Sequence, residues 1–331
     1  MRIAENYSLE HHNTFRLPVK TRRFIAYKDE EELSRILRDN FFIEHPFLSI
    51  GEGSNILFVK DFDGTILHSR IKGIQVIDHS VILRIGAGEH WDDVVAYAVS
   101  KGRGGIENLS FIPGTVGAAA VQNIGAYGVE IKDVIETVET YNPVTCKKHL
   151  FTNEECRYGY RHSFFKDNPF IITAVSIRLQ QPPQFKLDYG NLAEALEGQD
   201  ITLQSVRDAI IKIRRDKLPD PAALGNAGSF FKNPVIPLSQ IDELKRCNPS
   251  IPSYPASESS IKISAAWLIE QCGFKGKREG NVGIYDKQAL ILVNYGNATG
   301  AEILTFAQKI QQAVYGKFNI HLVPEVQIIE S

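Results

Sequence analysis

Residues 108–129, NLSFIPGTVGAAAVQNIGAYGV, form a stretch of 22 residues without one charged side chain. Four glycines and a proline interrupt it, so we expect a buried, tightly turning main chain rather than a continuous apolar helix. Residues 113–117 predict a turn whose N–H groups face a ligand, and residues 118–123 predict a helix whose positive end faces the same place. Such a backbone suits a phosphate or an electron-rich ring, although a glycine-rich packing turn is the alternative.

A second glycine loop lies upstream, between predicted strands at 47–50 and 56–59, with the sequence Gly51-Glu52-Gly53-Ser54-Asn55. A Rossmann fingerprint would open a helix, and a Walker loop needs Gly-Lys-Ser/Thr, so neither motif applies. Backbone amides of this loop could wrap a diphosphate. A plain hairpin turn between the two strands is the alternative interpretation.

The composition is that of an ordinary globular chain. At 331 residues the chain exceeds one typical core, so two or three lobes are expected. A formal net charge of -2 without a basic tail argues against nucleic acid as the main partner. There is no run of about 18 apolar residues and no hydrophobic signal region at the N-terminus. We therefore expect a cytoplasmic protein that does not bind membranes.

The cysteines and the N-terminal histidines give no metal pattern. Cys146, Cys156, Cys247 and Cys272 contain no C-x-x-C pair, which favours reduced thiols over disulfides or a zinc site. We expect Cys272 to be a small core residue at a helix end rather than a nucleophile. The two histidines at 11–12 have no further metal-ligating residue at a suitable spacing, so no metal is expected and both side chains are expected on the exposed surface.

Hydrophobic periodicity predicts a mixed chain in which residues 65 to 185 form an α+β unit. Gly102 is expected to end one helix and Ser264 to cap the start of another. Pro324 would limit the final strand to a sheet edge or a strand start. The predicted strands are 24–27, 47–50, 56–59, 65–68, 74–78, 81–85, 133–141, 170–179, 289–294 and 321–329. The predicted helices are 29–38, 90–101, 203–216, 263–271 and 300–316, with a helix and loop at 237–250.

Several polar residues have both a functional and an ordinary interpretation. Arg161 lies in an aromatic and cationic run at 157–166, where a guanidinium could clamp a carboxylate or simply form a surface ion pair. Ser229 follows a glycine turn, and Glu325 alone would be an exposed glutamate. The basic glycine loop at 273–280 would suit a diphosphate or plain solvent.

Five motifs in order resemble the UDP-N-acetylenolpyruvoylglucosamine reductase family in its longer, first subtype: SIGEGSN, KGRGGIENLSFIPGTVGAAAVQNIGAYG, YRHSFFK, KLPDP and GSFFKNP. The match runs from about Asn13 to Val326. The resemblance implies an α+β chain: a two-subdomain FAD-binding fold of the vanillyl-alcohol-oxidase (PCMH-like) type, with a C-terminal α+β substrate-binding domain. We expect FAD subdomains at 1–66, joined by a strand at 320–331, and at 67–215, and a substrate domain at 216–319.

The resemblance also implies roles for individual residues. Arg161 and Glu325 would polarise the substrate carboxylate, and Ser229 would protonate the carbanion. Non-covalent FAD would contact Gly51, Glu52, Gly53, Ser54, Asn55, Pro113, Gly114, Thr115, Gly117, Ala118, Gly125 and Arg214. The substrate would contact Tyr189, Lys217, Asn233 and Gln288.

The implied reaction reduces UDP-N-acetylglucosamine enolpyruvate for peptidoglycan precursor synthesis in a bacterial cytoplasm. NADPH would reduce FAD and leave before substrate enters, although the spacing does not distinguish NADPH from NADH. A monomer is expected. Two alternatives are an FAD oxidase of the same superfamily, which leaves GSFFKNP and Glu325 unexplained, and a non-catalytic nucleotide-sugar binder.

Overall fold

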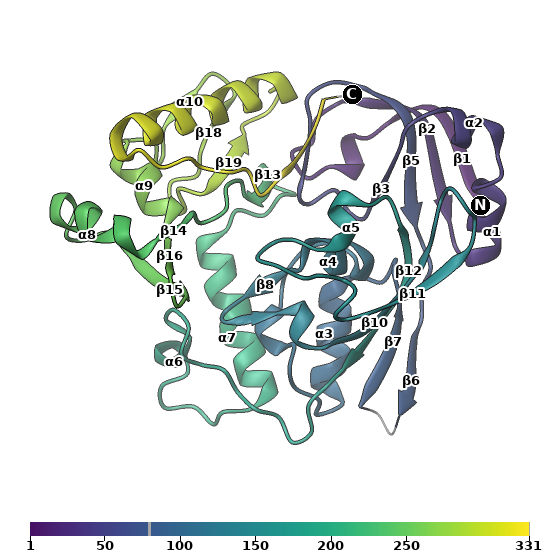
Figure 1. Cartoon of the computed structure of the whole chain (residues 1–331), viewed down its shortest axis with the longest axis horizontal. Helices are drawn as coiled ribbons and strands as arrows, with labels where there is room; N and C mark the ends of the chain where they lie inside the picture. The colour runs from purple at the N-terminus through teal and green to yellow at the C-terminus, as the bar shows by residue number, and fades with distance from the viewer. Residues whose placement is uncertain (79–80, 331) are drawn as a thin grey trace. The chain divides into compact units, whose positions relative to one another are not determined.

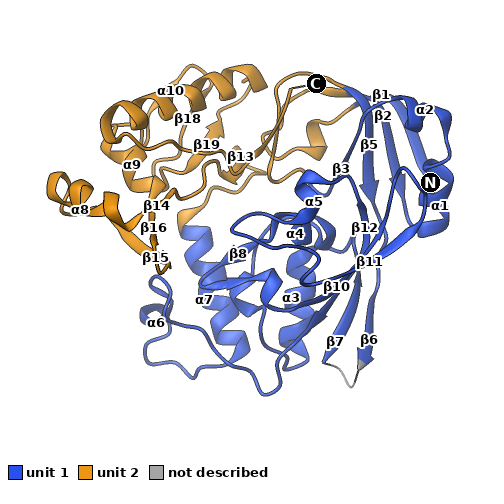
Figure 2. Cartoon of the chain, in the orientation of Figure 1, with its two compact units in different colours: residues 1–7, 21–52, 63–216 blue, residues 8–20, 53–62, 217–331 orange. Residues whose placement is uncertain are grey.

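The computed structural model describes residues 1–78 and 81–330, and the chain packs as two compact units (Figures 1 and 2). Unit 1 consists of Met1–Tyr7, Thr21–Glu52 and Asp63–Asp216. Unit 2 consists of Ser8–Lys20, Gly53–Phe62 and Lys217–Ser331. The chain therefore passes between the units more than once, and the glycine loop 51–55 gives two residues to unit 1 and three to unit 2.

The first sheet of unit 1 has the strand order β1-β2-β5-β3 and is accompanied by two short helices. β3 runs parallel to β5, with Ile50 opposite His68. Leu33 and Leu37 from the first helix region pack with Ile25 and Leu67 of the sheet. The elements are β1 (Arg2–Ser8), β2 (Lys20–Tyr27), α1 (Glu30–Ile36), α2 (Asn40–Glu44), β3 (Phe47–Ile50) and β5 (Phe62–Ser69).

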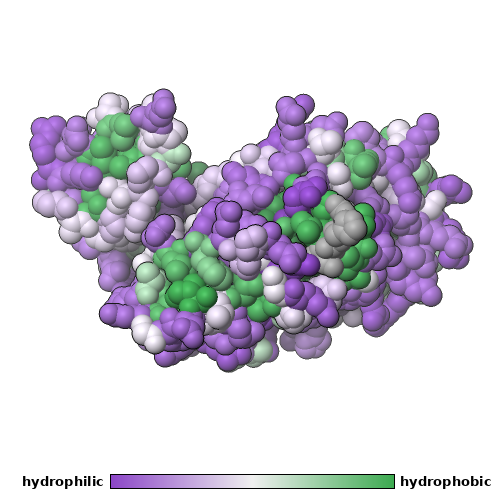
Figure 3. All heavy atoms as spheres, turned by 90° about the horizontal axis from the view of Figure 1, so that it is seen from below, coloured by the Kyte–Doolittle hydropathy of each residue, from purple (hydrophilic) through white to green (hydrophobic). Residues whose placement is uncertain are grey.

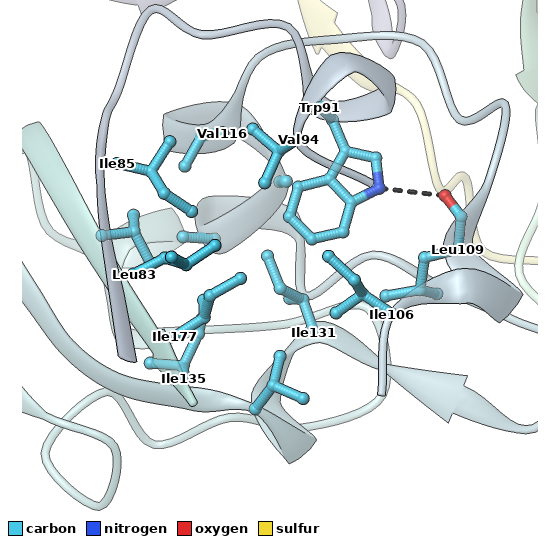
Figure 4. Packing of buried hydrophobic residues seen from close by; sticks show 14 of the residues in the cluster. Leu83, Ile85, Trp91, Val94, Ile106, Leu109, Val116, Ile131, Ile135 and Ile177 are labelled. Carbon is cyan, nitrogen blue, oxygen red and sulfur yellow. Dashed lines mark hydrogen bonds between the residues drawn. The ribbon is translucent and has the colours of Figure 1, made fainter. Parts of the chain in front are cut away.

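The second sheet of unit 1 is antiparallel, with the order β11-β10-β12-β7-β6. Its core side packs against helices α3 and α4, and Trp91 lies fully buried at the centre with its indole N–H donating to the Leu109 carbonyl at 2.9 Å (Figure 4). The elements are β6 (Ile74–Asp78), β7 (Ile82–Gly86), α3 (Trp91–Ser100), α4 (Val116–Gln122), β10 (Ile135–Tyr141), β11 (Lys148–Thr152) and β12 (Ile171–Arg178).

Several short elements and the long helix α7 complete unit 1. α7 buries Val206, Ile210 and Ile213 against Leu192 and Leu196 at α6. A two-residue turn joins β8 and β9, which pair with Ala126 opposite Val129. The elements are η2 (Glu107–Leu109), β8 (Gly125–Ala126), β9 (Val129–Glu130), η3 (Ile131–Asp133), α5 (Phe164–Asp167), α6 (Leu192–Ala195) and α7 (Leu203–Lys217).

Unit 2 contains a sheet of order β13-β19-β18-β17, a sheet of order β14-β16-β15, and a parallel pair of β20 with β4. A Cβ at Gly300 would lie 1.9 Å from the Phe58 carbonyl oxygen, so only glycine lets α10 start against β4. The elements are η1 (Glu10–His12), β4 (Ile56–Phe58), β13 (Gly225–Ser229), β14 (Val235–Pro237), α8 (Leu238–Cys247), β15 (Ser253–Ser257), β16 (Ser260–Ile263), α9 (Ala265–Gln271), β17 (Arg278–Glu279), β18 (Val282–Ile284), β19 (Ile291–Asn294), α10 (Gly300–Phe318) and β20 (Gln327–Ile329).

Most predicted elements are confirmed within one to three residues at each end. The predicted helix end at Gly102 and the predicted helix cap at Ser264 are confirmed as well. Gly102 has φ +67 just after α3, and the Ser264 hydroxyl accepts from the Trp267 N–H at 3.3 Å. The predicted strand 321–329 is wrong in its first half. β20 begins only at Gln327, because Pro324 makes a single bridge to Phe231 instead of entering a ladder.

Two further interpretations of the sequence need correction. The loop 51–55 is not a hairpin turn, since β3 pairs with β5 and β4 pairs with β20. His12 is half-buried rather than exposed. Cys272 lies at the end of α9 as predicted, but it is half-buried rather than part of the core, and burial raises the pKa of its thiol.

The surface mixes polar and apolar residues, with polar side chains predominating on the face that Figure 3 presents. Large apolar side chains that remain exposed include Val76, Ile77, Val144 and Leu150. Among the described residues, none of the helices combines the length and the apolar character needed to cross a bilayer.

Candidate functional site

The two glycine loops meet in unit 1. A Cβ built on Gly51 would lie 2.6 Å from the Thr115 hydroxyl oxygen and 3.2 Å from the Ala118 methyl group. The Glu52 carboxylate accepts the Gly114 N–H at 2.7 Å. Its other oxygen contacts Nδ1 of His90, the residue before α3. One carboxylate therefore fastens the first loop to the second.

The second loop is fixed by main-chain bonds to the start of α3 and to the strand β7 region. Gly114 has φ +118, and its carbonyl accepts the Trp91 N–H at 2.9 Å. The Gly117 N–H donates to the Ala87 carbonyl at 2.9 Å, and a Cβ at Gly117 would lie 3.0 Å from the Ala87 Cβ. α4 begins at Val116, two residues before the predicted helix, so the turn and the helix are both present. The N–H groups of Gly114, Val116 and Gly117 donate to Glu52, Glu89 and Ala87, which corrects the expectation that they face a ligand. Pro113 lies at the exposed entrance of this turn.

The rest of the first loop belongs to unit 2. Gly53 has φ +67, and a Cβ there would lie 2.0 Å from the His12 carbonyl oxygen, so the position requires glycine. Ser54 is half-buried. The Asn55 amide donates to the Glu325 carbonyl at 3.2 Å, and the Gln327 N–H donates to the Asn55 carbonyl at 3.0 Å. This half of the loop is thus tied to the main chain beside Glu325.

Arg161 is held against the β8–β9 hairpin of unit 1. Its Nη2 donates to the Gly125 carbonyl at 2.6 Å, and its Nη1 lies 3.9 Å from a Glu130 carboxylate oxygen. The side chain is 18% exposed. A Cβ at Gly125 would lie 2.8 Å from Nη1, so glycine at this position makes room for the guanidinium. The ion pair predicted as the ordinary interpretation is present, and it orients the guanidinium without fully burying it.

Ser229, Glu325 and Gln288 lie on adjacent main-chain segments of unit 2. Phe230, which follows Ser229, donates its N–H to the Leu290 carbonyl and accepts the Glu325 N–H, both at 2.8 Å. Gln288 is two residues before Leu290 and accepts its N–H through the side-chain oxygen at 3.3 Å. Glu325 and Ser229 are both half-buried, so Glu325 is not the exposed glutamate of the ordinary interpretation.

The predicted substrate contacts are divided between the units. In unit 2, the Asn233 side-chain oxygen accepts the Ala265 N–H at 2.9 Å in the first turn of α9, and Lys217 is exposed at the end of α7. In unit 1, Tyr189 is 50% exposed in the loop before α6, and its ring centroid lies 6.5 Å from that of Tyr127.

Arg214, predicted to contact the cofactor, is surrounded by partners in unit 1. Its Nε donates to the Phe111 carbonyl at 3.1 Å. Burial lowers the pKa of Arg214, although Tyr127 and Asp92 favour its charge. Asp92 in turn forms a bidentate pair with Arg207 at 2.7 and 2.8 Å.

Lysines of the basic loop at 273–280 form ion pairs with carboxylates of the chain. Lys275 pairs with Glu270 at 3.0 Å, and Lys277 pairs with Glu279 at 3.0 Å. These ion pairs favour a structural role over the diphosphate site that the sequence left open.

Sequence reasoning missed Tyr127 and Asn108 as parts of this arrangement. A Tyr-Gly pair is not a usual hairpin signal, because the first turn position normally takes Asn, Asp or Gly. A buried Asn108 bridging two segments has no local sequence pattern at all.

Comparison with known proteins identifies the chain. Residues 21–145 match the FAD binding domain, and residues 220–329 match the UDP-N-acetylenolpyruvoylglucosamine reductase C-terminal domain. The UDP-N-acetylenolpyruvoylglucosamine reductase of Porphyromonas gingivalis is 50% identical, covering 99% of this chain and 100% of the relative. That of Bacteroides fragilis is 46% identical over the same shares. The chain belongs to the UDP-N-acetylenolpyruvoylglucosamine reductase family.

As a member of the UDP-N-acetylenolpyruvoylglucosamine reductase family, the chain is a flavin oxidoreductase. The solved UDP-N-acetylenolpyruvylglucosamine reductase of Thermus caldophilus has the same fold, with a TM-score of 0.71 at 23% identity over 99% of both chains. The fold is therefore α+β: an FAD-binding fold of the vanillyl-alcohol-oxidase type followed by the family's C-terminal domain. Both glycine loops lie within the residues that match the FAD binding domain.

Proposed function

We propose that this enzyme uses NADPH to reduce UDP-N-acetylglucosamine enolpyruvate to UDP-N-acetylmuramate. The observation that carries the proposal is the combination, in one chain, of an FAD-binding domain and the C-terminal domain of this family, with 50% identity over 99% of the chain to a relative of that name. The product is a precursor of peptidoglycan, which suggests a role in cell-wall growth, cell shape and division in a bacterial cytoplasm.

Both glycine loops lie within the residues that match the FAD binding domain, which supports a non-covalent FAD at this place. An added carbon at Gly51 or Gly53 would collide with neighbouring atoms of the fold, so these glycines let the loops pack closely. The N–H groups of Gly114, Val116 and Gly117 already donate to Glu52, Glu89 and Ala87, so they are not the donors for a diphosphate. Bound FAD would supply the hydride donor for the enolpyruvyl group after accepting a hydride from NADPH. The residues proposed to hold it are Gly51, Glu52, Gly53, Ser54, Asn55, Pro113, Gly114, Thr115, Gly117, Ala118, Gly125 and Arg214.

Hydride addition to the terminal carbon leaves negative charge on the carbon that carries the carboxylate. Fixed cations and hydrogen-bond donors stabilise such charge, and losing one donor typically costs about 10²–10³ in rate. Arg161 is suited to this because Gly125 and Glu130 hold its guanidinium in one orientation. We propose that Arg161 and Glu325 polarise the carboxylate of the substrate.

Glu325 can take this role only in its protonated form, because an ionised carboxylate would repel the doubly charged intermediate. Glu325→Gln places a neutral side chain of nearly the same shape at this position. We expect it to keep much of the turnover, whereas Glu325→Ala loses about 10²–10³ of it. A Gln variant as inactive as the Ala variant would contradict the protonated form.

Ser229 is proposed to deliver the proton to the carbanion, after which solvent restores its own. A serine hydroxyl is a weak acid, but the adjacent carbanion is a strong base, so the transfer is feasible without a metal. A placed acid typically contributes about 10²–10⁴ in rate. Lys217, Asn233, Tyr189 and Gln288 are proposed to hold the sugar nucleotide.

The domain assignment follows the same scheme. FAD would be bound by residues 1–66 together with 320–331 and by residues 67–215, and substrate by residues 216–319. Pairing of β20 with β4 supports joining the C-terminal strand to the first of these. The enzyme is proposed to act as a monomer.

The test is a turnover assay with product analysis. Purified enzyme is incubated without oxygen with NADPH and UDP-N-acetylglucosamine enolpyruvate, and the nucleotide product is weighed by mass spectrometry. A product heavier by two hydrogen atoms, formed in proportion to the NADPH consumed, is expected. Turnover that needs oxygen would favour the oxidase, and a colourless protein that binds no added FAD would favour a non-catalytic binder.

A further inference from the structure

The β8–β9 hairpin carries a tyrosine in an unusual conformation at its tip. Tyr127 has φ +48 and Gly128 has φ +77, so both residues of the two-residue turn are left-handed. Bulky side chains rarely adopt this region, and Asn or Gly would adopt it without strain. A strained residue persists when its surroundings determine it, and such residues gather at functional sites. The side chain of Tyr127 is therefore the feature to explain.

Both ends of the Tyr127 side chain contact residues of the proposed site. Its hydroxyl lies near the guanidinium of Arg214, whose charge opposes the rise that burial causes in the pKa of Tyr127. Its ring meets Tyr189 edge to face, with centroids 6.5 Å apart and planes at 84°. The same ring packs on the α6 and α7 cluster, on which Phe185 and Leu187 of the Tyr189 loop also pack.

Asn108 ties the hairpin tip to the Tyr189 loop a second time. It is 1% exposed, and its side-chain amide donates to the carbonyls of Tyr127 and Lys186, both at 2.8 Å. Lys186 is three residues before Tyr189. A buried amide that serves two carbonyls is costly to remove, because both acceptors would then lack a partner.

We propose that Tyr127, held by Asn108, is a positioning residue that orders the Tyr189 loop for substrate binding. The inference rests on the proposed function, in which Tyr189 covers the sugar nucleotide. Tyr189 is half-exposed, so the face not used by Tyr127 is open to a ligand. Without the Tyr127 ring, the Tyr189 loop would become ordered only when substrate binds, and the free energy needed to order it would weaken substrate binding.

The functional test is a double-mutant cycle on the KM for UDP-N-acetylglucosamine enolpyruvate. Tyr127→Leu is expected to raise KM about three- to tenfold, and Tyr189→Leu by at least as much. The double variant should equal the larger single effect, because both changes break one contact. Effects that multiply, or a wild-type KM for Tyr127→Leu, would overturn the proposal. The rate of flavin reduction by NADPH should change less than twofold.

Two control variants separate positioning from folding. Tyr127→Phe keeps the ring and loses only the hydroxyl near Arg214, so its KM should equal that of the wild type. Tyr315 in α10 of unit 2 is a 45% exposed tyrosine whose ring stacks on that of His321. Tyr315→Leu should leave KM unchanged. A Tyr127→Phe variant as impaired as Tyr127→Leu would contradict a role for the ring.

A ligand-free measurement tests the inference separately from the proposed function. Amide hydrogen exchange at residues 185–190 is compared among wild type, Tyr127→Phe and Tyr127→Leu. Faster exchange only in Tyr127→Leu is expected, and equal exchange in all three would overturn the proposal even if turnover is normal. If instead exchange responds as expected but the wild type fails to reduce the substrate, the proposed function fails and the anchoring role of Tyr127 stands.

Discussion

The two units support their candidate site residues in different ways. In unit 1, side-chain contacts position the candidate residues. Gly125 and Glu130 orient Arg161, and the ring of Tyr189 packs edge to face against that of Tyr127. In unit 2 the main chain does the positioning, since the bonds of Phe230 to Leu290 and Glu325 fix the backbone beside Ser229 and Glu325. Substitutions of Ser229 and Glu325 in unit 2 should therefore change chemistry alone, whereas substitutions of supporting residues in unit 1 should change both fold and function.

The largest expected effect is that of Ser229→Ala. Turnover should fall by about 10²–10⁴, because the proton donor is lost, while the rate of flavin reduction by NADPH and the melting temperature stay at wild-type values. Stopped-flow absorbance of each half-reaction and a thermal melt measure these quantities. Equal slowing of both half-reactions would contradict the role of Ser229 and the independence of chemistry from folding in unit 2.

Gly125→Ala is the matching change in unit 1. Its new methyl group would lie 2.8 Å from the Arg161 Nη1 and 2.9 Å from the Glu130 Cγ, so the guanidinium must move. We expect kcat to fall about 10- to 100-fold and stability to fall by about 1–3 kcal/mol.

The control is Gly316→Ala in α10, where a methyl group has no neighbour within 4 Å. Alanine there should leave kcat unchanged and stabilise the helix slightly, by about 0.5–1 kcal/mol. A Gly125→Ala variant with wild-type kcat would show that the orientation of Arg161 does not matter.

Glu52→Ala tests the contact between the two glycine loops. It removes the acceptor of the Gly114 N–H, and loss of a hydrogen bond to a charged group costs about 1.5–3 kcal/mol. We expect FAD binding, measured by flavin fluorescence, to weaken about tenfold, with Glu52→Gln much closer to wild type because its amide oxygen still accepts. Unchanged FAD affinity in Glu52→Ala would show that the loops keep their geometry without this carboxylate.

The smallest effect concerns His68, which pairs across the sheet with Ile50, the residue before the first loop. Burial lowers the pKa of His68 from its usual 6.5, so below that pH the unfolded chain binds more protons than the folded one. This contribution to stability is complete above pH 6.5 and is lost as pH falls through the lower, folded-state pKa.

Urea unfolding at several pH values measures the effect. Stability of the wild type should rise with pH below 6.5, by no more than about 1.4 kcal/mol for each pH unit. His68→Asn should flatten that rise. An unchanged slope in the variant would mean that other groups cause it.

Local signals predicted much of unit 1, because its elements follow the rules of their own sequence. Gly102 follows α3 where helix-end chemistry requires it, and the turn at 113–117 opens α4 as expected. Ser264 caps α9 of unit 2 by the same local chemistry. Tyr127 was missed because its conformation opposes its local preference and is imposed by distant partners. The strands β13 to β18 escaped prediction because they are short and lack the apolar run that marks equally short strands such as β3 (FLSI) and β4 (ILF).

The first glycine loop shows why sequence proximity was misleading. Its flanking strands looked like a hairpin, yet they pair with β5 and β20, which are remote in the chain. Gly53 is needed because of the His12 carbonyl, more than 40 residues earlier. The residues named for catalysis and binding came from motifs rather than from periodicity, and their roles remain predictions.

The most direct test of the proposed reduction is anaerobic stopped-flow absorbance at the flavin band. The enzyme is first reduced with NADPH and then mixed with UDP-N-acetylglucosamine enolpyruvate. Rapid bleaching followed by rapid return of the colour without oxygen is the expected result. Bleaching that reverses only when air is admitted would contradict the reductase and leave an oxidase with the same flavin site.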